Sequence, residues 1–447
     1  MRILHNVNQV YSFLNISKTS DPLPIKSICI NSKQASKHSL FFGLPGENTD
    51  GSKYFEEALA KEAALCIIKH GFKDEKNHTA ILECEDVLFT MTELSKACRQ
   101  IFRGKVIGIT GSNGKTTTKE IIKQALPNIF ATEGNLNNEI GVPINILNLE
   151  DSHHYAAIEM GAAKMGDIKY LSSIALQDIG VITSIGRSHI SGFGSVEAIL
   201  EEKSEVIKNL PADGLAVVPF GQHVDFWNSV KTSEKLVTFG LDRRADYCLE
   251  IVSNDLDNSQ QKIEVFIKQK SIGFFYSNLL GAHNALNLGA AFAVCHNLGL
   301  QLEEFSNRLK ELSNIHNRLG LATWIKNSTI IDDTYNANPD STIAALKYLA
   351  SFSGKEKIAV LGDMLELGND SKEYHSNIGE MAKALDIDIL LGFGEFMQYA
   401  VESFGSNGIF FTREAELKEY LKEYAAVDKV FLLKGSRGMK MERFKII

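Results

Sequence analysis

Between about residue 104 and residue 210, short apolar runs alternate with segments in which apolar residues recur every three or four positions. The runs KVIGIT, YAAIEM and DIGVITSI are each followed by such a segment, and these segments begin at about Thr116, Asp167 and Val196. Apolar runs that alternate with helical segments of this length are typical of a parallel sheet built from strand–helix–strand units. We therefore predict a central α/β domain in this part of the chain.

A second alternating series begins near Ala322, where the runs STIIDD, KIAVLG, DILLG, GIFFT and KVFLLKG are separated by helical patterns. Between the two series, residues 235–277 are richer in strand-forming residues, and KIEVFIK and SIGFFYS are predicted to pair in antiparallel fashion. The first 100 residues mix short strands and helices. We predict three α/β domains, 1–100, 101–317 and 318–447, with the active site at a junction between them.

The composition adds limits on the class of protein. The 447 residues are 44% hydrophobic and 23% charged, as in a soluble globular protein, and the net charge of -8 argues against a large nucleic-acid-binding surface. The apolar stretch LLGAHNALNLGAAFAVCHNLGL is predicted to contain a buried helix and no membrane span, because its His and Asn side chains would be costly in lipid.

Two further patterns favour a cytoplasmic protein. The six cysteines are scattered without a CxxC pair, which is typical of a reducing compartment and argues against a structural zinc site. The segment MRILHNVNQVYSF lacks the apolar core of a signal peptide.

The segment GITGSNGKTTTKE, residues 108–120, lies between an apolar run and a predicted helix. Glycines let backbone N–H groups close around phosphate oxygens, and the helix N-terminus adds partial positive charge. Lys115 is expected to bridge the outer phosphates, and Thr116 to offer its hydroxyl to Mg²⁺. The spacing TGxxGKTT differs from the common Walker A loop. An ordinary turn with a capping threonine is the alternative, but it gives the lysine no packing role.

Two candidate metal ligands follow neighbouring predicted strands. Glu159 ends the run YAAIEM, and carboxylates at such strand ends face the crevice in which ligands of open α/β sheets bind. Carboxylate oxygens suit Mg²⁺. His189 follows the next strand, in SIGRSHISGFGS. Taken alone, a strand-end glutamate is more often solvated and a lone histidine more often structural, so both alternatives stay open here.

The segment SVEAILEEKSEVIKNL places a lysine on an apolar helix face. The stripe consists of Val196, Ile199, Leu200, Lys203, Val206 and Ile207, while Glu201, Glu202 and Glu205 are predicted to lie off it. Lys203 either extends its ammonium to water, as long basic side chains do, or lies in a cleft as a neutral amine that adds CO₂ to form a carbamate. The residue types alone favour the first reading.

Together these motifs resemble those of the Mur ligase family of peptidoglycan synthesis, over nearly the whole chain. GITGSNGKTTTKE resembles the family's ATP loop, ATEGNLNNEIGVP the motif after its first helix, and IEMGA and SIGRSHISGFGS its two metal-side motifs. GAHNALNLGAA resembles the adenine-side helix, NRLG the arginine turn and DDTYNANPDS the start of the C-terminal domain. VLGDMLELG and LLKGSRGMKME are most similar to segments of the family member that adds D-alanyl-D-alanine.

The resemblance implies an N-terminal domain for the UDP-muramoyl substrate, a central P-loop ATPase domain with a parallel sheet and a C-terminal Rossmann-like domain. It implies an ATP- and Mg²⁺-dependent ligase that joins D-alanyl-D-alanine to the terminal carboxylate of UDP-N-acetylmuramoyl tripeptide through an acyl phosphate. We expect a cytoplasmic monomer with no nucleic-acid partner and no transmembrane segment.

The resemblance also implies the roles of individual residues. The catalytic residues would be Lys115, Glu159, His189 and Lys203, with Lys203 carbamylated, and the metal ligands Thr116, Glu159, His189 and Lys203. ATP would contact Thr110, Gly111, Ser112, Asn113, Gly114, Lys115, Thr116, Thr117, Asn284, Asn287, Arg318, Asp333 and Asn338. The other substrates would contact Ser32, Lys33, Asn137, Asn138, Tyr335 and Asn336.

One motif departs from the family pattern, and some alternatives stay open. Where the family commonly has Asp-Ser-Arg, this chain has Asn31, Ser32 and Lys33, and lysine lacks the planar fork of arginine. The diaminopimelate- or lysine-adding member usually has Tyr-Ala-His-Thr-Pro where this chain has TYNANPDS, and a folylpolyglutamate synthetase would lack GDMLELG and KGSRGMKME. A regulatory P-loop switch is disfavoured because the chain has no Asn-Lys-x-Asp motif and such a switch gives Lys203 no role.

Overall fold

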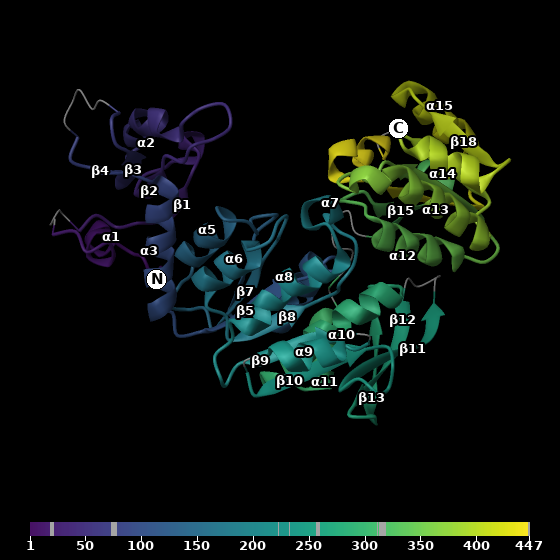
Figure 1. Cartoon of the computed structure of the whole chain (residues 1–447), viewed down its shortest axis with the longest axis horizontal. Helices are drawn as coiled ribbons and strands as arrows, with labels where there is room; N and C mark the ends of the chain where they lie inside the picture. The colour runs from purple at the N-terminus through teal and green to yellow at the C-terminus, as the bar shows by residue number, and fades with distance from the viewer. Residues whose placement is uncertain are drawn as a thin grey trace.

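The computed structural model describes residues 1–17, 22–72, 78–221, 223–231, 233–255, 260–310, 312 and 319–445. Three sheets follow one another along the chain, with four, nine and six strands. Figure 1 shows them in three bodies, with the N-terminal one in purple, the central one in blue to teal and the C-terminal one in green to yellow. This is the predicted three-domain α/β architecture. The exact boundaries at residues 101 and 318 stay predictions.

The N-terminal sheet is wholly parallel, in the order β1-β2-β3-β4. Its strands are β1 Ser27–Cys29, β2 Ser39–Phe42, β3 Leu65–Lys69 and β4 Ile81–Cys84, and its helices are α1 Val7–Phe13, α2 Phe55–Ala60 and α3 Val87–Ile101. Strand β2 is buried along its whole length. Helix α3 leads from this sheet to the first central strand (Figure 1).

The central sheet has the order β13-β12-β11-β10-β9-β8-β5-β7-β6. The strands are β5 Lys105–Thr110, β6 Ile129–Ala131, β7 Tyr155–Glu159, β8 Ile179–Ile182, β9 Leu215–Pro219, β10 Lys235–Gly240, β11 Tyr247–Asp255, β12 Gln260–Ile267 and β13 Lys270–Ser277. The strands from β6 to β11 pair in parallel. The last three are antiparallel, which confirms the predicted pairing of KIEVFIK with SIGFFYS.

Helices cover both faces of the central sheet. They are α4 Lys115–Ala125, α5 Gly141–Leu147, α6 Asp167–Ala175, α7 Ile190–Phe193, α8 Val196–Lys208, α9 Val224–Val230, α10 Ala282–Asn297 and α11 Leu302–Leu309. Apolar residues of α4, α10 and α11 pack on one face, and those of α5, α6 and α8 on the other. The predicted buried helix is α10. No helix among the described residues combines the length and apolarity needed to cross a bilayer.

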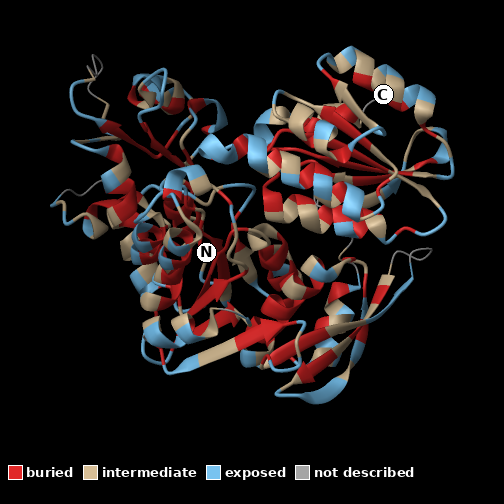
Figure 2. Ribbon diagram, turned by 45° about the vertical axis from the view of Figure 1, so that its right-hand side comes forward, coloured by how far each residue is buried: buried red, intermediate tan, exposed pale blue. Residues whose placement is uncertain are grey.

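The C-terminal sheet has the order β14-β15-β19-β16-β17-β18 and is parallel except for β14. The strands are β14 Gly320–Thr323, β15 Thr329–Asp333, β16 Glu356–Gly362, β17 Ile389–Phe393, β18 Gly408–Phe411 and β19 Lys429–Lys434. The helices are α12 Pro339–Ala350, α13 Ser371–Ala384, α14 Met397–Phe404 and α15 Glu414–Tyr424. The predicted second series is therefore confirmed, and Figure 2 shows its strands buried between the helices.

Candidate active site

The glycine-rich loop connects β5 to α4 through two glycines whose geometry excludes a side chain. Gly114 has a φ of 86°, and a Cβ there would lie 2.2 Å from Oδ1 of Asn287. Gly111 has a φ of 150°, and its Cβ would lie 2.0 Å from Oγ1 of Thr183. Helix α4 begins after Gly114 with no side-chain cap among the described residues. Its N-terminus, with its partial positive charge, therefore suits an anion.

Residues at the end of β8 hold this loop from the side. Thr183 Oγ1 donates to the carbonyl of Asn113 at 2.5 Å, and the Asn113 N–H donates to Ser184 Oγ at 2.8 Å. The Ser112 hydroxyl donates to the Gly186 carbonyl at 2.9 Å. Sequence reasoning missed Thr183 and Ser184. The pattern that could have identified them is their position at the end of the apolar run DIGVITSI. This run forms β8, which pairs with β5, the strand that carries the loop.

Glu159 points at the loop and not at solvent. Its side chain accepts hydrogen bonds from Thr116 Oγ1 at 3.0 Å and from Asn137 Nδ2 at 2.9 Å, and the residue is 2% exposed. Lys115 Nζ donates to the Gly111 carbonyl at 2.7 Å, so the side chain folds back over its own loop. The structure thus gathers the predicted residues Lys115, Thr116, Asn137 and Glu159 in one place.

Lys203 is buried on the inner face of α8, at 2% exposure. The pKa of its ammonium is lowered to about 7, mainly by burial and also by the positive charge of Lys115, while the carboxylate of Glu202 acts in the opposite direction. No hydrogen bond or ion pair of the Lys203 ammonium occurs within the described parts of the chain. The buried position of Lys203 argues against the alternative in which its ammonium extends into water.

The prediction that Glu202 lies off the apolar stripe is wrong. Glu202 is 1% exposed, and its carboxylate accepts hydrogen bonds from the N–H groups of Gly166 at 2.7 Å and Ile168 at 2.6 Å. These are amides at the start of α6, whose positive end a carboxylate stabilises. Glu202 therefore joins α8 to α6. Glu201 is exposed and Glu205 half-buried.

His189 is the residue before α7 and has a left-handed φ of 54°. Its Nδ1 lies 2.5 Å from Oε2 of Glu366, which comes from the C-terminal domain. Burial lowers the pKa of His189, the Glu366 carboxylate raises it, and the charges of Lys115 and Lys203 lower it again. Sequence reasoning placed His189 near the metal side but gave no sign of Glu366.

Other contacts join the loop to the C-terminal domain. Asn338 caps α12, and its Nδ2 donates to Oδ1 of Asn113 at 2.8 Å. The Arg187 N–H donates to Oδ2 of Asp340 at 2.8 Å. Within the C-terminal domain, Lys434 Nζ donates to Oδ2 of Asp333 at 2.6 Å, and both residues are buried. The nucleotide-type loop and the start of α12 therefore face each other across one space.

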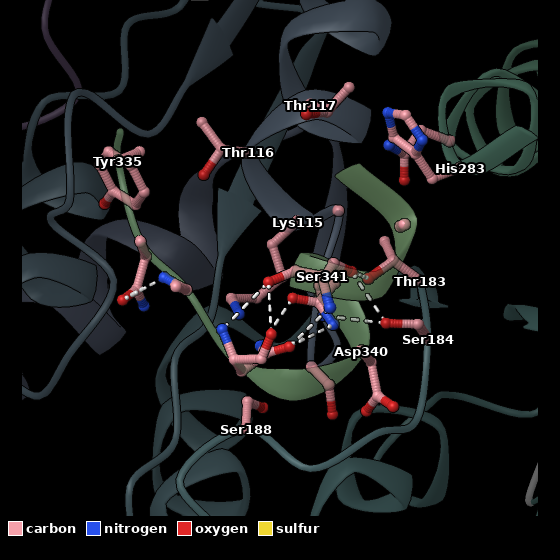
Figure 3. Close-up of a pocket in the computed structure, with 18 of the residues that line it drawn as sticks. Lys115, Thr116, Thr117, Thr183, Ser184, Ser188, His283, Tyr335, Asp340 and Ser341 are labelled. Atoms are coloured by element: carbon pink, nitrogen blue, oxygen red, sulfur yellow. Dashed lines mark hydrogen bonds between the residues drawn. The ribbon is translucent and has the colours of Figure 1, made fainter. Parts of the chain in front are cut away.

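That space is a cavity of about 470 Å³. In Figure 3, Lys115, Thr116 and Thr117 lie around it together with Tyr335, Asp340 and Ser341 of the C-terminal domain. Of the predicted residues, those that line it are Ser112, Asn113, Gly114, Lys115, Thr116, Thr117, Asn137, Glu159, His189, Asn284, Asn287, Asp333, Tyr335, Asn336 and Asn338. Sequence reasoning missed further lining residues, among them Ser188, His283, Asp340 and Lys434.

Other predicted residues lie outside this cavity. Thr110, Gly111 and Lys203 are not among its lining residues. Asn138 lines an adjoining cavity of about 330 Å³ together with Lys115, Asn137 and His189. Arg318 lies outside the described residues.

The N-terminal substrate residues belong to a different body of the molecule. Ser32 Oγ donates to Oε2 of Glu57 at 2.9 Å, and Lys33 is exposed. Lys61 Nζ donates to the Ser32 carbonyl at 2.8 Å. Neither Ser32 nor Lys33 lines either of the two cavities described above.

The residues at the loop fit a Mg²⁺ ion that is completed by a ligand. Within the described residues, no group of three His, Cys, Asp or Glu side chains could hold a metal alone. The hydroxyl of Thr116, the carboxylate of Glu159 and the imidazole of His189 lie around one cavity, and Mg²⁺ usually takes its remaining ligands from phosphates and water.

The family models for Mur ligases match three successive parts of the chain. The Mur ligase family catalytic domain matches residues 24–105, the Mur ligase middle domain 109–295 and the Mur ligase glutamate ligase domain 317–437. The UDP-N-acetylmuramoyl-tripeptide–D-alanyl-D-alanine ligase of Bacillus subtilis strain 168 is 33% identical over 427 residues, which cover 94% of this chain and 92% of that protein.

Solved structures agree over the same length. MurF from Acinetobacter baumannii superposes with a TM-score of 0.87 at 29% identity, covering 98% of this chain and 97% of that one. The MurF ligase from Thermotoga maritima in complex with ADP gives a TM-score of 0.83 at 29% identity, covering 95% of this chain and 97% of that one. With sequence and structure matched across all three domains, this chain belongs to the Mur ligase family.

Proposed function

We propose that this protein is the ATP-dependent ligase that joins D-alanyl-D-alanine to the terminal carboxylate of UDP-N-acetylmuramoyl tripeptide in peptidoglycan precursor synthesis. The relatives matched over nearly the whole chain carry this name. The observation that carries the proposal is the cavity itself. It combines the glycine loop and Glu159 of the central domain with Asp333 and Asn338 of the C-terminal domain, so one space can hold a nucleotide and its acceptor.

The nucleotide would lie with its phosphates on the loop and its base toward the C-terminal domain. A further cavity of about 430 Å³ shares His283, Leu286, Asp340 and Ala344 with the first one. It is mostly apolar, but Nε2 of His283 and the hydroxyl of Tyr348 are buried there without partners among the described residues. An aromatic base with polar edges suits such a pocket. Asn284, Asn287 and Arg318 would complete this side.

Lys115 would leave the Gly111 carbonyl and turn to the outer phosphates, where its charge offsets the negative charge of phosphoryl transfer. Thr116, Glu159, His189 and carbamylated Lys203 would hold Mg²⁺. The ion would supply charge stabilisation at the phosphoryl oxygens. To form the carbamate, the neutral Lys203 amine attacks the carbon of CO₂, a new N–C bond forms and one proton leaves. Its lowered pKa of about 7 makes the neutral amine accessible near neutral pH.

The reaction then takes two steps. The tripeptide carboxylate attacks the γ-phosphorus of ATP, which gives an acyl phosphate and ADP. The amine of D-alanyl-D-alanine attacks the acyl carbon, loses a proton and expels inorganic phosphate. Asn137 and Asn138 lie beside Lys115 in the adjoining cavity, so they would orient the carboxylate-bearing end of the tripeptide. Tyr335 and Asn336 would contact the substrates from the C-terminal domain, while Ser32 and Lys33 would serve the UDP-muramoyl end.

The test combines phosphate release with mass spectrometry of the product. With ATP and Mg²⁺, phosphate release should require both the UDP-muramoyl tripeptide and D-alanyl-D-alanine, and the joined pentapeptide should appear in equal amount. A nucleotide switch would hydrolyse ATP with neither, and that result would overturn the proposal. A panel of tripeptides with diaminopimelate or lysine as the third residue identifies the natural substrate.

Lys115→Ala gives the test at the level of one residue. Loss of a single charge-stabilising group in a transition state costs about 3–4 kcal/mol, so product formation should fall by at least about 100-fold. Lys123→Ala, on the exposed side of the same helix, is the matched control and should keep its rate. Near-normal ligation by folded Lys115→Ala protein would contradict the role of the loop.

A further inference from the structure

The His189–Glu366 contact joins the metal side of the central domain to the C-terminal domain. Glu366 Oε2 lies 2.5 Å from His189 Nδ1. The backbone N–H of Ser191 donates to the Glu366 carbonyl at 3.3 Å, so the two segments meet at two points. Nδ1 lies close enough to donate a hydrogen bond to the carboxylate. In the neutral imidazole this pairing leaves Nε2 unprotonated, and an unprotonated nitrogen is the form that binds a metal.

The segment before Glu366 is held firmly by its own domain. The N–H of Met364 donates to Nε2 of the buried His375 at 3.0 Å, and the N–H of Leu365 donates to Oγ of Ser436 at 2.8 Å. Asp363 accepts the N–H groups of Phe396 and Met397 at 3.0 and 2.9 Å. Glu366 therefore comes to His189 from a fixed position and not from a free loop, although its side chain is 60% exposed.

The His189 loop is touched by the C-terminal domain on either side of the histidine. The backbone N–H of Arg187 donates to the carboxylate of Asp340, and its guanidinium carbon lies 5.9 Å from the centroid of the Tyr374 ring. Ser191 follows on the other side. The C-terminal domain thus contacts this loop at Arg187, at His189 and at Ser191. Among the described residues, Glu366 is the only one whose carboxylate contacts the imidazole of His189.

We propose that Glu366 is a positioning residue of the metal site. This proposal rests on the proposed role of His189 as a metal ligand. Its carboxylate fixes the tautomer and orientation of the imidazole through Nδ1 and leaves Nε2 for the metal. Carboxylates that hold a ligating histidine in this way commonly contribute 10–100-fold to metal affinity. Because Glu366 belongs to the C-terminal domain, metal binding in the central domain becomes dependent on the approach of its neighbour.

The experiment measures metal binding and not turnover. Full-length protein is titrated with Mn²⁺ in the presence of ADP, and free Mn²⁺ is followed by electron paramagnetic resonance. We expect Glu366→Ala to weaken binding about 10- to 100-fold. Glu366→Gln keeps a carbonyl oxygen that can accept from Nδ1, so it should restore part of the affinity. Glu380→Ala, an exposed glutamate on α13 of the same domain, should bind Mn²⁺ as the unchanged protein does.

A double-mutant cycle with His189→Ala separates the two levels of the proposal. If Glu366 acts through His189, then Glu366→Ala should cause no further loss in the His189→Ala background. The role of Glu366 alone would be overturned by either of two results. The losses of Mn²⁺ affinity from the two substitutions could be additive, or Glu366→Ala could keep its Mn²⁺ affinity although His189→Ala loses it. Unchanged affinity in His189→Ala would instead overturn the ligand role of His189. Thermal unfolding of each variant establishes that the compared proteins are folded.

Discussion

The Lys203 side chain lies at 2% exposure on helix α8, where its ammonium would be a buried charge without a counter-ion at hydrogen-bond distance among the described residues. Burying an unpaired charge is costly, and a lysine in this position releases its proton more easily than in water. The proposed carbamylation would turn this cost into a function, because it would replace the cation by an anion beside the charge of Lys115.

Chemical rescue tests the carbamate. Lys203→Ala should be nearly inactive, and high concentrations of acetate or formate should restore part of the activity by supplying the missing anion to Mg²⁺. The same acids should not help Lys115→Ala, which lacks a cation. Lys203→Arg should respond poorly, because guanidinium stays charged and forms no carbamate. Full activity of Lys203→Ala in CO₂-depleted buffer would contradict this role.

The stability of the protein should depend on pH through Lys203. Its pKa falls from 10.5 to about 7 on folding, so the unfolded chain binds more protons between these values and the free energy of unfolding rises with pH across that window. Below about pH 7 the folded chain carries the full cost of the buried ammonium. Lys203→Met removes this cost, so in CO₂-depleted buffer its Tm should exceed that of the unchanged protein at pH 6.5, by a margin that shrinks toward pH 9. Equal margins at both pH values would contradict the lowered pKa.

At the level of elements, the start of α4 depends on the left-handed conformation of Gly114. Gly114→Ala adds a methyl group where Asn287 lies, besides the strain of a φ of 86°. We expect a loss of ADP affinity, measured by isothermal titration calorimetry, of at least about 10-fold. Gly299→Ala is the control, because Gly299 has a φ of 99° but no atom within 4 Å of its added Cβ. It should lower Tm through a backbone cost of about 1–3 kcal/mol while leaving ADP affinity unchanged.

The helices and strands were the part of the structure that could be predicted best from the sequence. The alternating apolar runs located β5, β7, β8 and the whole C-terminal series, because buried parallel strands and amphipathic helices leave different periodicities. Glu202 was misplaced because its partners, the amides at the start of α6, belong to another element and leave no mark on the helix that carries it. Lys203 was placed on the inner face by the same periodicity that failed for its neighbour.

The part of the site that crosses between domains could not be predicted. Glu366 meets His189, and Asn338 meets Asn113, only because separate sheets come together, and no local pattern encodes that approach. The resemblance supplied Asn338, but Glu366 and Lys434 appeared only in the structure. Lys434 lies 101 positions from its partner Asp333, so no local pattern links the two residues.

At the level of the whole molecule, the central domain should bind nucleotide without completing the reaction. A fragment of residues 101–317 keeps the loop, Glu159 and His189 but lacks Asp333, Asn338 and Glu366. Equilibrium dialysis should show weak ATP binding, and mass spectrometry should show no product. Product formed by this fragment would mean that the C-terminal domain is dispensable.

The strand order of the C-terminal sheet has a consequence for biosynthesis. Strand β19, residues 429–434, lies between β15 and β16, although β15 and β16 are made about 70 to 100 residues earlier. While the chain is still on the ribosome, these two strands have no central partner, and the sheet cannot close until β19 emerges. Lys434 on β19 is also the partner of Asp333. The nascent protein can therefore complete its N-terminal and central bodies first, and it gains a finished active site only after β19 has emerged.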